Sequence, residues 1–225
     1  GIVANIEFMS LGRFRSHLLG QAAAAQGVGS SPAAWQPRSL RWAVLRALSD
    51  AGESTEGLGA RATRIAALFD RYHLHRPEMM ANWAEGRPID DLGEELSSGL
   101  VWQFDMWQRC RALIGKPSPA EIMVGLRSRP PSAAISAVLP ARLAIFGVNV
   151  MSSDVAQTLV WLAQNHDIEV LQLSSSVVAA SRSSAPRNRL LRSWGAATLR
   201  LLDELLPNAS IKTVQAAADS HTVLG

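Results

Sequence analysis

A short apolar run that ends in glycine, residues 142–147 (RLAIFG), constrains the fold of this chain more than any other segment. Such a run, bounded by turn residues, is typical of a buried strand. Ser152 or Ser153 can cap a helix that reaches about Asn165, and residues 168–173 (IEVLQL) are the next expected strand. The sequence therefore predicts a βαβ unit, whose crossover favours a parallel pair of strands.

Residues 1–135 are predicted to be almost wholly helical, apart from an extended segment over residues 1–8. Apolar residues recur there at three- and four-residue spacing, which is the helical period. Clusters of glycine, serine and proline separate the helices. The expected helices are 10–26, 38–48, 60–75, 78–83, 95–114 and 120–126, and a last one, after a serine-rich loop over 174–186, is 190–206. The fold class predicted is α/β and mostly helical.

Composition narrows the class of protein without deciding its function. The 225 residues suffice for one large domain or two small ones. Cys110 is the only cysteine, which excludes an internal disulfide or a thiolate metal cluster and fits a reducing compartment such as the cytoplasm. No apolar stretch reaches the length of a membrane span. The net charge of +3 permits nucleic-acid binding but does not demand it.

Motifs for catalysis are not found in the sequence. Residues 147–151 (GVNVM) lack the glycines and lysine that cradle phosphates, and residues 115–118 (GKPS) follow a helix instead of a strand. His73 and His75 are two residues apart, which places them on different sides of a helix and disfavours a shared metal. Four acidic residues over 90–95 are expected to stabilise a helix start. A nucleotide-dependent enzyme with an atypical site after the 142–147 strand is the alternative.

The helix expected over 60–75 carries a row of arginines. Arg64 and Arg71 are seven residues apart and project from nearly the same side, and Arg76 follows at the helix end before Pro77. Guanidinium groups beside an apolar anchor can meet phosphates, although surface helices also carry arginines for solubility. The apolar face expected on this helix is Ile65, Leu68, Phe69 and Tyr72.

Seven tryptophans are expected to fill the core more often than to stack on bases. Trp42 is among the expected anchors of the 38–48 helix. The anchors expected in the 95–114 helix are Trp102, Met106, Cys110 and Leu113.

Five segments resemble, in order and spacing, the RecC family, the gamma subunits of bacterial exodeoxyribonuclease V. These segments are residues 1–8 (GIVANIEF), 68–77 (LFDRYHLHRP), 102–107 (WQFDMW), 139–147 (LPARLAIFG) and 190–195 (LLRSWG). The resemblance implies an N-terminal piece of a protein built like a superfamily 1 helicase whose motor motifs have decayed. Residues 1–34 and 136–225 would form the helicase-like α/β lobe, and residues 35–135 an all-helical insertion lobe.

The same resemblance implies a non-catalytic role in an ATP-dependent helicase–nuclease that processes double-strand DNA ends for recombinational repair. The expected partners are the beta and alpha subunits (RecB and RecD), the duplex end and the 3′-ended single strand. ATP and Mg²⁺ would bind in the partner subunits, with no cofactor and no catalytic residue in this chain. A fragment that contacts only proteins is the alternative.

Leu68, Asp70 and Arg76 match positions that face the 3′-ended strand in this family. With Arg64 and Arg71 they make up the predicted DNA-binding residues, and for Leu68 a place in the core is the equal alternative. An arginine can grip phosphate or a base edge, and an aspartate can accept a hydrogen bond from an exocyclic amine.

The chain departs from the family pattern in ways that favour passage of the strand by charge and shape over the familiar reading of a hotspot sequence. The departures are Ser10, Ser16, Ala67, Glu121 and the short 174–186 loop.

Overall fold

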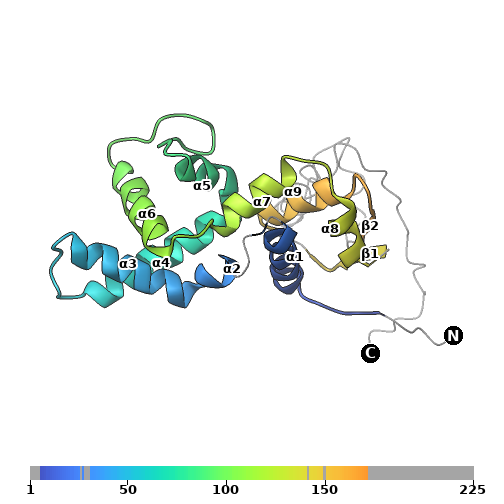
Figure 1. Ribbon diagram of the computed structural model, residues 1–225, viewed down its shortest axis with the longest axis horizontal. Coiled ribbons are helices and arrows are strands. Elements are labelled where there is room, and N and C mark those ends of the chain that lie inside the picture. The colour runs from blue at the N-terminus through green and yellow to red at the C-terminus, as the bar shows by residue number, and fades with distance from the viewer. Residues whose placement is uncertain (1–5, 26, 28–30, 141, 149–150, 172–225) are drawn as a thin grey trace, which may run out of the picture. The chain divides into compact units, whose positions relative to one another are not determined.

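Helices dominate the computed structural model (Figure 1), which describes residues 6–25, 27, 31–140, 142–148 and 151–171. In chain order the elements are α1 (Leu11–Ala25), α2 (Ser31–Ala34), α3 (Pro37–Asp50), α4 (Leu58–His75), α5 (Pro77–Ala84), α6 (Val101–Ile114), α7 (Pro119–Arg127), α8 (Ala133–Val138), β1 (Arg142–Phe146), α9 (Ser153–Leu162) and β2 (Asp167–Leu171). The predicted mostly helical α/β class is confirmed. The expected helix 190–206 and the 174–186 loop lie outside the described residues.

The predicted helices that fall on described residues are present, but one of them begins later than expected. The acidic cluster over 90–95 does not lie at a helix start, because α6 begins only at Val101. Instead the Asp90 carboxylate closes a turn, where its Oδ1 accepts from the backbone N–H groups of Leu92 and Glu94 at 2.8 and 3.0 Å. Ile89 and Glu95 then pair as an isolated antiparallel bridge. The two short helices α2 and α8 were not predicted, since segments of four and six residues carry little periodic signal.

Residues 115–118 (GKPS) end one helix and start the next. Gly115 follows α6 with a φ of 66°, the left-handed conformation that glycine adopts without strain. Ser118 then caps α7: its Oγ accepts from the Glu121 N–H at 3.3 Å, while the Glu121 carboxylate accepts from the Ser118 N–H at 2.7 Å. Pro119 occupies the first helical turn, where a missing N–H costs nothing. Two helix ends therefore account for this motif.

Three buried tryptophans lie at the centre of the helical core, as predicted for most of these rings. Trp35 and Trp107 stack with ring centroids 5.9 Å apart, and Trp83 meets Trp107 nearly edge-on at 6.3 Å. Side chains of α3, α4, α5 and α6 pack around them. Each such burial contributes roughly 2–3 kcal/mol of hydrophobic free energy.

Two expected tryptophan anchors are wrong. Trp42 is 56% exposed and Trp102 is also exposed, as is Leu113. On α6 the buried face is formed by Met106, Trp107 and Cys110, so the inward stripe runs one residue further along the helix than Trp102. The two rings therefore remain available at the surface.

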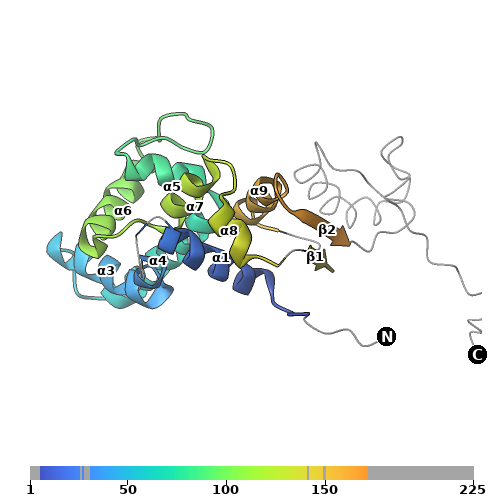
Figure 2. The same ribbon diagram turned by 45° about the vertical axis from the view of Figure 1, so that its right-hand side comes forward.

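The predicted βαβ unit is confirmed, and its two strands pair in parallel (Figure 2). α9 is the crossover, and its inward face includes Val155, Leu159 and Leu162. The first strand is less buried than a central strand would be, because Ile145 is buried while Phe146 is 67% exposed.

Contacts between helices run from the tryptophan core to the βαβ crossover. α4 packs along α3 and also contacts α5 and α9, and α7 packs against α5, α1 and α9. None of the helices in the described part of the chain is both long enough and apolar enough to cross a membrane.

Candidate nucleic-acid interface

The predicted DNA-binding residues divide between two sides of α4 and its end. Arg64 and Arg71 are both exposed, and the half-buried Leu68 lies between them on the same side, since these positions are four and three residues apart. Asp70 does not join this stripe, because the helical period turns it to another side, and Arg76 lies beyond the last helical residue, His75. We call Arg64, Leu68 and Arg71 the α4 stripe.

The two arginines of the α4 stripe have no ion pair among the described residues, in contrast to several neighbours. Arg46 pairs with Asp50 on α3, with Nε 2.8 Å from Oδ1. Arg61 pairs with Glu53, and Arg87 with Glu85. The stripe therefore presents two guanidinium groups that are not paired with any carboxylate of the described residues.

Arg76 lies at the junction of α4 and α5, where it is partly engaged. Its backbone has left the helix, with φ −139° and ψ 51°, as the following Pro77 predicts. Its Nε lies 3.3 Å from Asp91 Oδ2, and its guanidinium lies over the Tyr72 ring at 5.3 Å. Burial raises the pKa of Asp91, and Arg76 acts against that rise. A phosphate that binds Arg76 would have to compete with this carboxylate.

Asp70 is turned toward the protein interior. Its pKa is raised because burial disfavours the carboxylate, while the nearby Arg15 guanidinium opposes that shift. An aspartate in this position is half-buried, so only part of it is open to a ligand.

A buried charged cluster joins α1, α7 and α9 next to α4. The Asp154 carboxylate of α9, fully buried, accepts from Arg15 Nε of α1 and from Arg127 Nη1 of α7, both at 2.6 Å. Arg15 also reaches the backbone carbonyl of His73 on α4 at 3.5 Å. Arg127 donates to Thr158 as well, at 3.1 Å. The two arginine side chains are only 10–13% exposed, so the cluster lies inside the protein, against the C-terminal end of α4.

His73 is buried in the same region. The sequence predicts only that it does not share a metal with His75. Its ring meets Trp35 edge-on at 5.2 Å, and neither ring nitrogen has a hydrogen-bond partner among the described residues. Burial, and to a smaller extent the Arg15 charge, lower the pKa of His73 to about 3. The imidazole is therefore a neutral core side chain at physiological pH.

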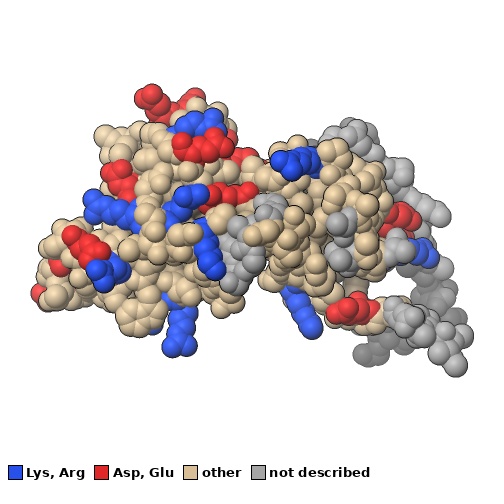
Figure 3. Space-filling model, viewed as in Figure 1, with Lys and Arg blue, Asp and Glu red and all other residues tan. Residues whose placement is uncertain are grey.

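Positive and negative groups are interspersed over the face that Figure 3 shows, with large uncharged areas between them. A broad basic surface is not seen on this face. Contact with a polyanion would therefore depend on local sets of unpaired arginines, such as the α4 stripe.

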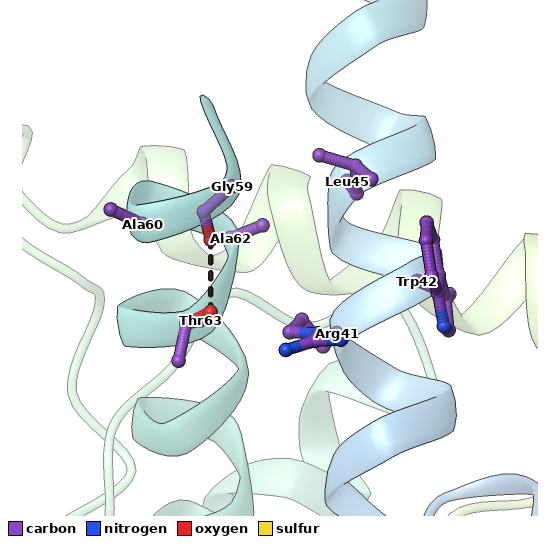
Figure 4. A pocket seen from close by; sticks show the side chains of 7 residues that line it. All are labelled: Arg41, Trp42, Leu45, Gly59, Ala60, Ala62 and Thr63. Atoms are coloured by element: carbon purple, nitrogen blue, oxygen red, sulfur yellow. Dashed lines mark hydrogen bonds between the residues drawn. The ribbon is translucent and has the colours of Figure 1, made fainter. Parts of the chain in front are cut away.

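A groove between α3 and α4, lined in part by Arg41, Trp42 and Thr63, was not anticipated (Figure 4). The signal that could have found it is Trp42, whose helical spacing from Leu40 and Val44 places it off their buried face. Among the described residues no set of three metal-binding side chains gathers anywhere.

Comparison with known proteins supplies the family. A family model described as the RecC N-terminal domain matches residues 1–221. Proteins called RecBCD enzyme subunit RecC from two strains of Mycobacterium tuberculosis, CDC 1551 and H37Rv, are each 34% identical over 113 residues, which cover 48% of this chain and 9% of theirs. The protein of the same name from Mycolicibacterium smegmatis is 26% identical over 196 residues, covering 76% of this chain and 16% of its own length. The chain thus spans less than a fifth of these curated relatives, and it belongs to the RecC N-terminal domain family.

Proposed function

We propose that this chain is part of a non-catalytic, DNA-handling subunit of a RecBCD-type helicase–nuclease, which processes double-strand DNA ends for recombinational repair. Membership of the RecC N-terminal domain family supports the proposal, as do relatives named as subunits of the RecBCD enzyme. In this role the chain scaffolds the complex and guides the 3′-ended strand after the duplex is parted. RecB and RecD are the proposed partners, and ATP and Mg²⁺ are proposed to act there.

The organisation proposed for this role has two lobes. Residues 1–34 and 136–225 form a helicase-like α/β lobe that has lost its motor chemistry, and residues 35–135 form a helical insertion. The parallel β1–β2 pair with its α9 crossover supports the first part. The tryptophan core shared by α3, α4, α5 and α6 supports the second.

The single observation that carries the DNA contact is the α4 stripe. Arg64 and Arg71 are exposed and free of carboxylate partners among the described residues, on a helix that packs along α3 and contacts α5 and α9. A rigid row of guanidinium groups can bind successive phosphates of a strand. Leu68 gives the stripe an apolar surface for sugar or base. Arg76 would exchange its ion pair with Asp91 for a phosphate of the strand. Asp70 would accept a hydrogen bond from the strand through the part of its carboxylate that is exposed.

Charge reversal on the α4 stripe tests the proposal. In the protein's native assembly, the double variant Arg64→Glu/Arg71→Glu is compared with Arg46→Glu/Arg87→Glu, whose arginines already have carboxylate partners. Binding of a duplex with a single-stranded 3′ tail is titrated by fluorescence anisotropy over a range of salt concentrations. The plot of log K against log salt has a negative slope, and each lost phosphate contact should reduce the magnitude of this slope by about 0.7.

The stripe variant should lose affinity at low salt and show a slope that is shallower by about 1.4, equivalent to two contacts. The control should keep the wild-type slope. Identical affinities and slopes for wild type and the stripe variant would contradict the proposal. Loss of RecB or RecD from the stripe variant, with DNA binding by the remaining assembly unchanged, would instead favour the protein-contact alternative.

A further inference from the structure

The groove between α3 and α4 has a volume of about 400 Å³, within the range of small-molecule and single-nucleotide sites. Its floor and walls are formed mostly by small or apolar side chains, among them Leu45, Gly59, Ala60 and Ala62. A Cβ built on Gly59 meets no other atom within 4 Å, so the groove is open at that point.

Arg41 is the charged residue that lines this groove. Its side chain extends from α3 toward α4, where Thr63 lies on the facing helix (Figure 4). The Thr63 hydroxyl donates to the Gly59 carbonyl at 2.9 Å, so its remaining capacity is that of an acceptor. No carboxylate lines the groove, and Arg41 has no ion pair among the described residues. Among the described lining residues, the charge is therefore that of Arg41 alone.

Arg38 lies one helical turn before Arg41, and it too is exposed and without an ion pair in the described part of the chain. On the other side of the groove, Arg64 follows Thr63 directly. Arg41 thus lines the groove, and Arg38 and Arg64 lie close to its lining residues in sequence; among the described residues no carboxylate lines it. Such a charge pattern is complementary to a polyanion and disfavours a cationic partner.

Trp42 adds an aromatic surface next to this charge. Its ring is 56% exposed, and the Arg41 guanidinium lies 5.7 Å from the ring centroid. The cation holds the ring in place without burying it. An exposed ring beside an unpaired guanidinium is the combination with which proteins bind single strands, because the base stacks while the phosphate is neutralised.

We propose that the α3–α4 groove binds one nucleotide of single-stranded DNA, with a phosphate at Arg41 and the neighbouring base stacked on Trp42. This inference rests on the proposed function, which supplies the strand. It adds a contact outside the α4 stripe and makes α3 and α4 together the surface that the strand follows. Arg38 and Arg64 then meet the phosphates on either side of the bound nucleotide.

Photochemical crosslinking locates the contact. A 3′-tailed duplex with 5-iododeoxyuridine along its tail is bound to the protein in its native assembly and irradiated. Tryptic peptides that carry nucleotide are then identified by mass spectrometry. Trypsin releases Trp42 in the peptide of residues 42–46 (WAVLR), whereas the α4 stripe falls in neighbouring peptides such as 65–71 (IAALFDR). The two contacts are therefore read separately.

Nucleotide attached to residues 42–46 in the wild type is the expected result. Trp42→Ala should abolish this crosslink. Arg41→Glu should reduce it at least tenfold at moderate salt, with the cleavage pattern changed because one arginine is lost. Arg46→Glu, one turn further along α3 and already paired with Asp50, should leave crosslinking at Trp42 unchanged. Trp102→Ala is the matched control for an exposed ring on another helix.

Two outcomes overturn the inference in different ways. Crosslinks on the α4 peptides with none on residues 42–46 would contradict the groove site and leave the proposed function intact. Crosslinks absent from the whole chain, while the DNA stays bound to the assembly, would contradict both. Binding of a partner protein that protects Trp42 regardless of DNA would also overturn the site, since the groove would then be a protein interface.

Discussion

Arg15 and Asp154 are 139 residues apart in sequence, yet the Arg15 Nε donates to the Asp154 Oδ2 at 2.6 Å. This pair ties α1 to α9, and the second oxygen of the same carboxylate ties α7 to α9 through Arg127. Arg15 also reaches the His73 carbonyl at 3.5 Å, so the cluster lies against α4, which packs chiefly along α3. The candidate DNA-binding helix therefore borders charges that do not themselves face a ligand.

Asp154→Asn should destabilise the contacts among α1, α7 and α9 by about 3 kcal/mol, because it leaves the largely buried Arg15 without its anion and Arg127 with only the more distant Glu78 carboxylate, at 3.4 Å. Hydrogen exchange of amides in these helices, followed by mass spectrometry, measures the loss as faster local opening. Asp50→Asn removes the carboxylate of the exposed Arg46–Asp50 ion pair. It should change the opening free energy measured by hydrogen exchange by less than about 0.5 kcal/mol. Equal effects of the two substitutions would contradict a stabilising role for the cluster.

His73 should make the stability of α4 depend on pH. The unfolded chain binds a proton on this ring below its ordinary pKa of 6.5, whereas the folded protein does so only near pH 3. The contribution of the neutral His73 ring to the free energy of unfolding is therefore complete above pH 6.5. It falls as the pH drops toward 3, by up to about 1.4 kcal/mol per pH unit. Hydrogen exchange of α4 amides, corrected for intrinsic rates, should show this trend between pH 6.5 and 4.5.

His73→Phe keeps a ring against Trp35 and removes the titration. Its α4 amides should exchange with a nearly pH-independent opening free energy over the same range. A wild type and variant with the same pH dependence would show that other groups, such as carboxylates, govern the acid sensitivity of this helix.

Two glycines should respond in opposite ways to alanine. Gly20 lies inside α1 with no atom within 4 Å of an added Cβ, so Gly20→Ala should stabilise that helix by about 0.5–1 kcal/mol. Gly115 has a φ of 66° after α6, so Gly115→Ala should destabilise the helix end by about 1 kcal/mol. Thermal unfolding of the protein with each substitution tests the pair, and shifts of the same sign would contradict it.

Local patterns sufficed to predict much of the fold. The spacing of apolar residues located α1, α3, α4, α5 and α7, and the glycine after Phe146 marked the end of β1. The α6 start was misplaced because an acidic run resembles a helix N-terminus, while the side chain of Asp90 closes a turn instead. Periodicity cannot distinguish these uses of a carboxylate.

The candidate site was predicted only where it depends on one helix. The seven-residue spacing of Arg64 and Arg71 is visible in the sequence, and the structure adds that neither has an ion pair in its described part. The groove beside them requires α3 and α4 to pack together, as does the exposure of Trp42. Asp154 likewise meets Arg15 only after the chain has folded, so no local pattern could identify that pair.

The central claim, that the 3′-ended strand runs along α4, is tested most directly by a photocrosslinking amino acid placed at position 71. Benzoyl-phenylalanine there replaces an exposed arginine, and the same group at the exposed position 87 is the control. The native assembly is loaded with duplexes that carry a labelled 3′ or 5′ tail. We expect a crosslink from position 71 to the 3′-ended strand and none from position 87. Assemblies that bind the DNA but show no crosslink from position 71, or a crosslink only to the 5′-ended strand, would contradict it.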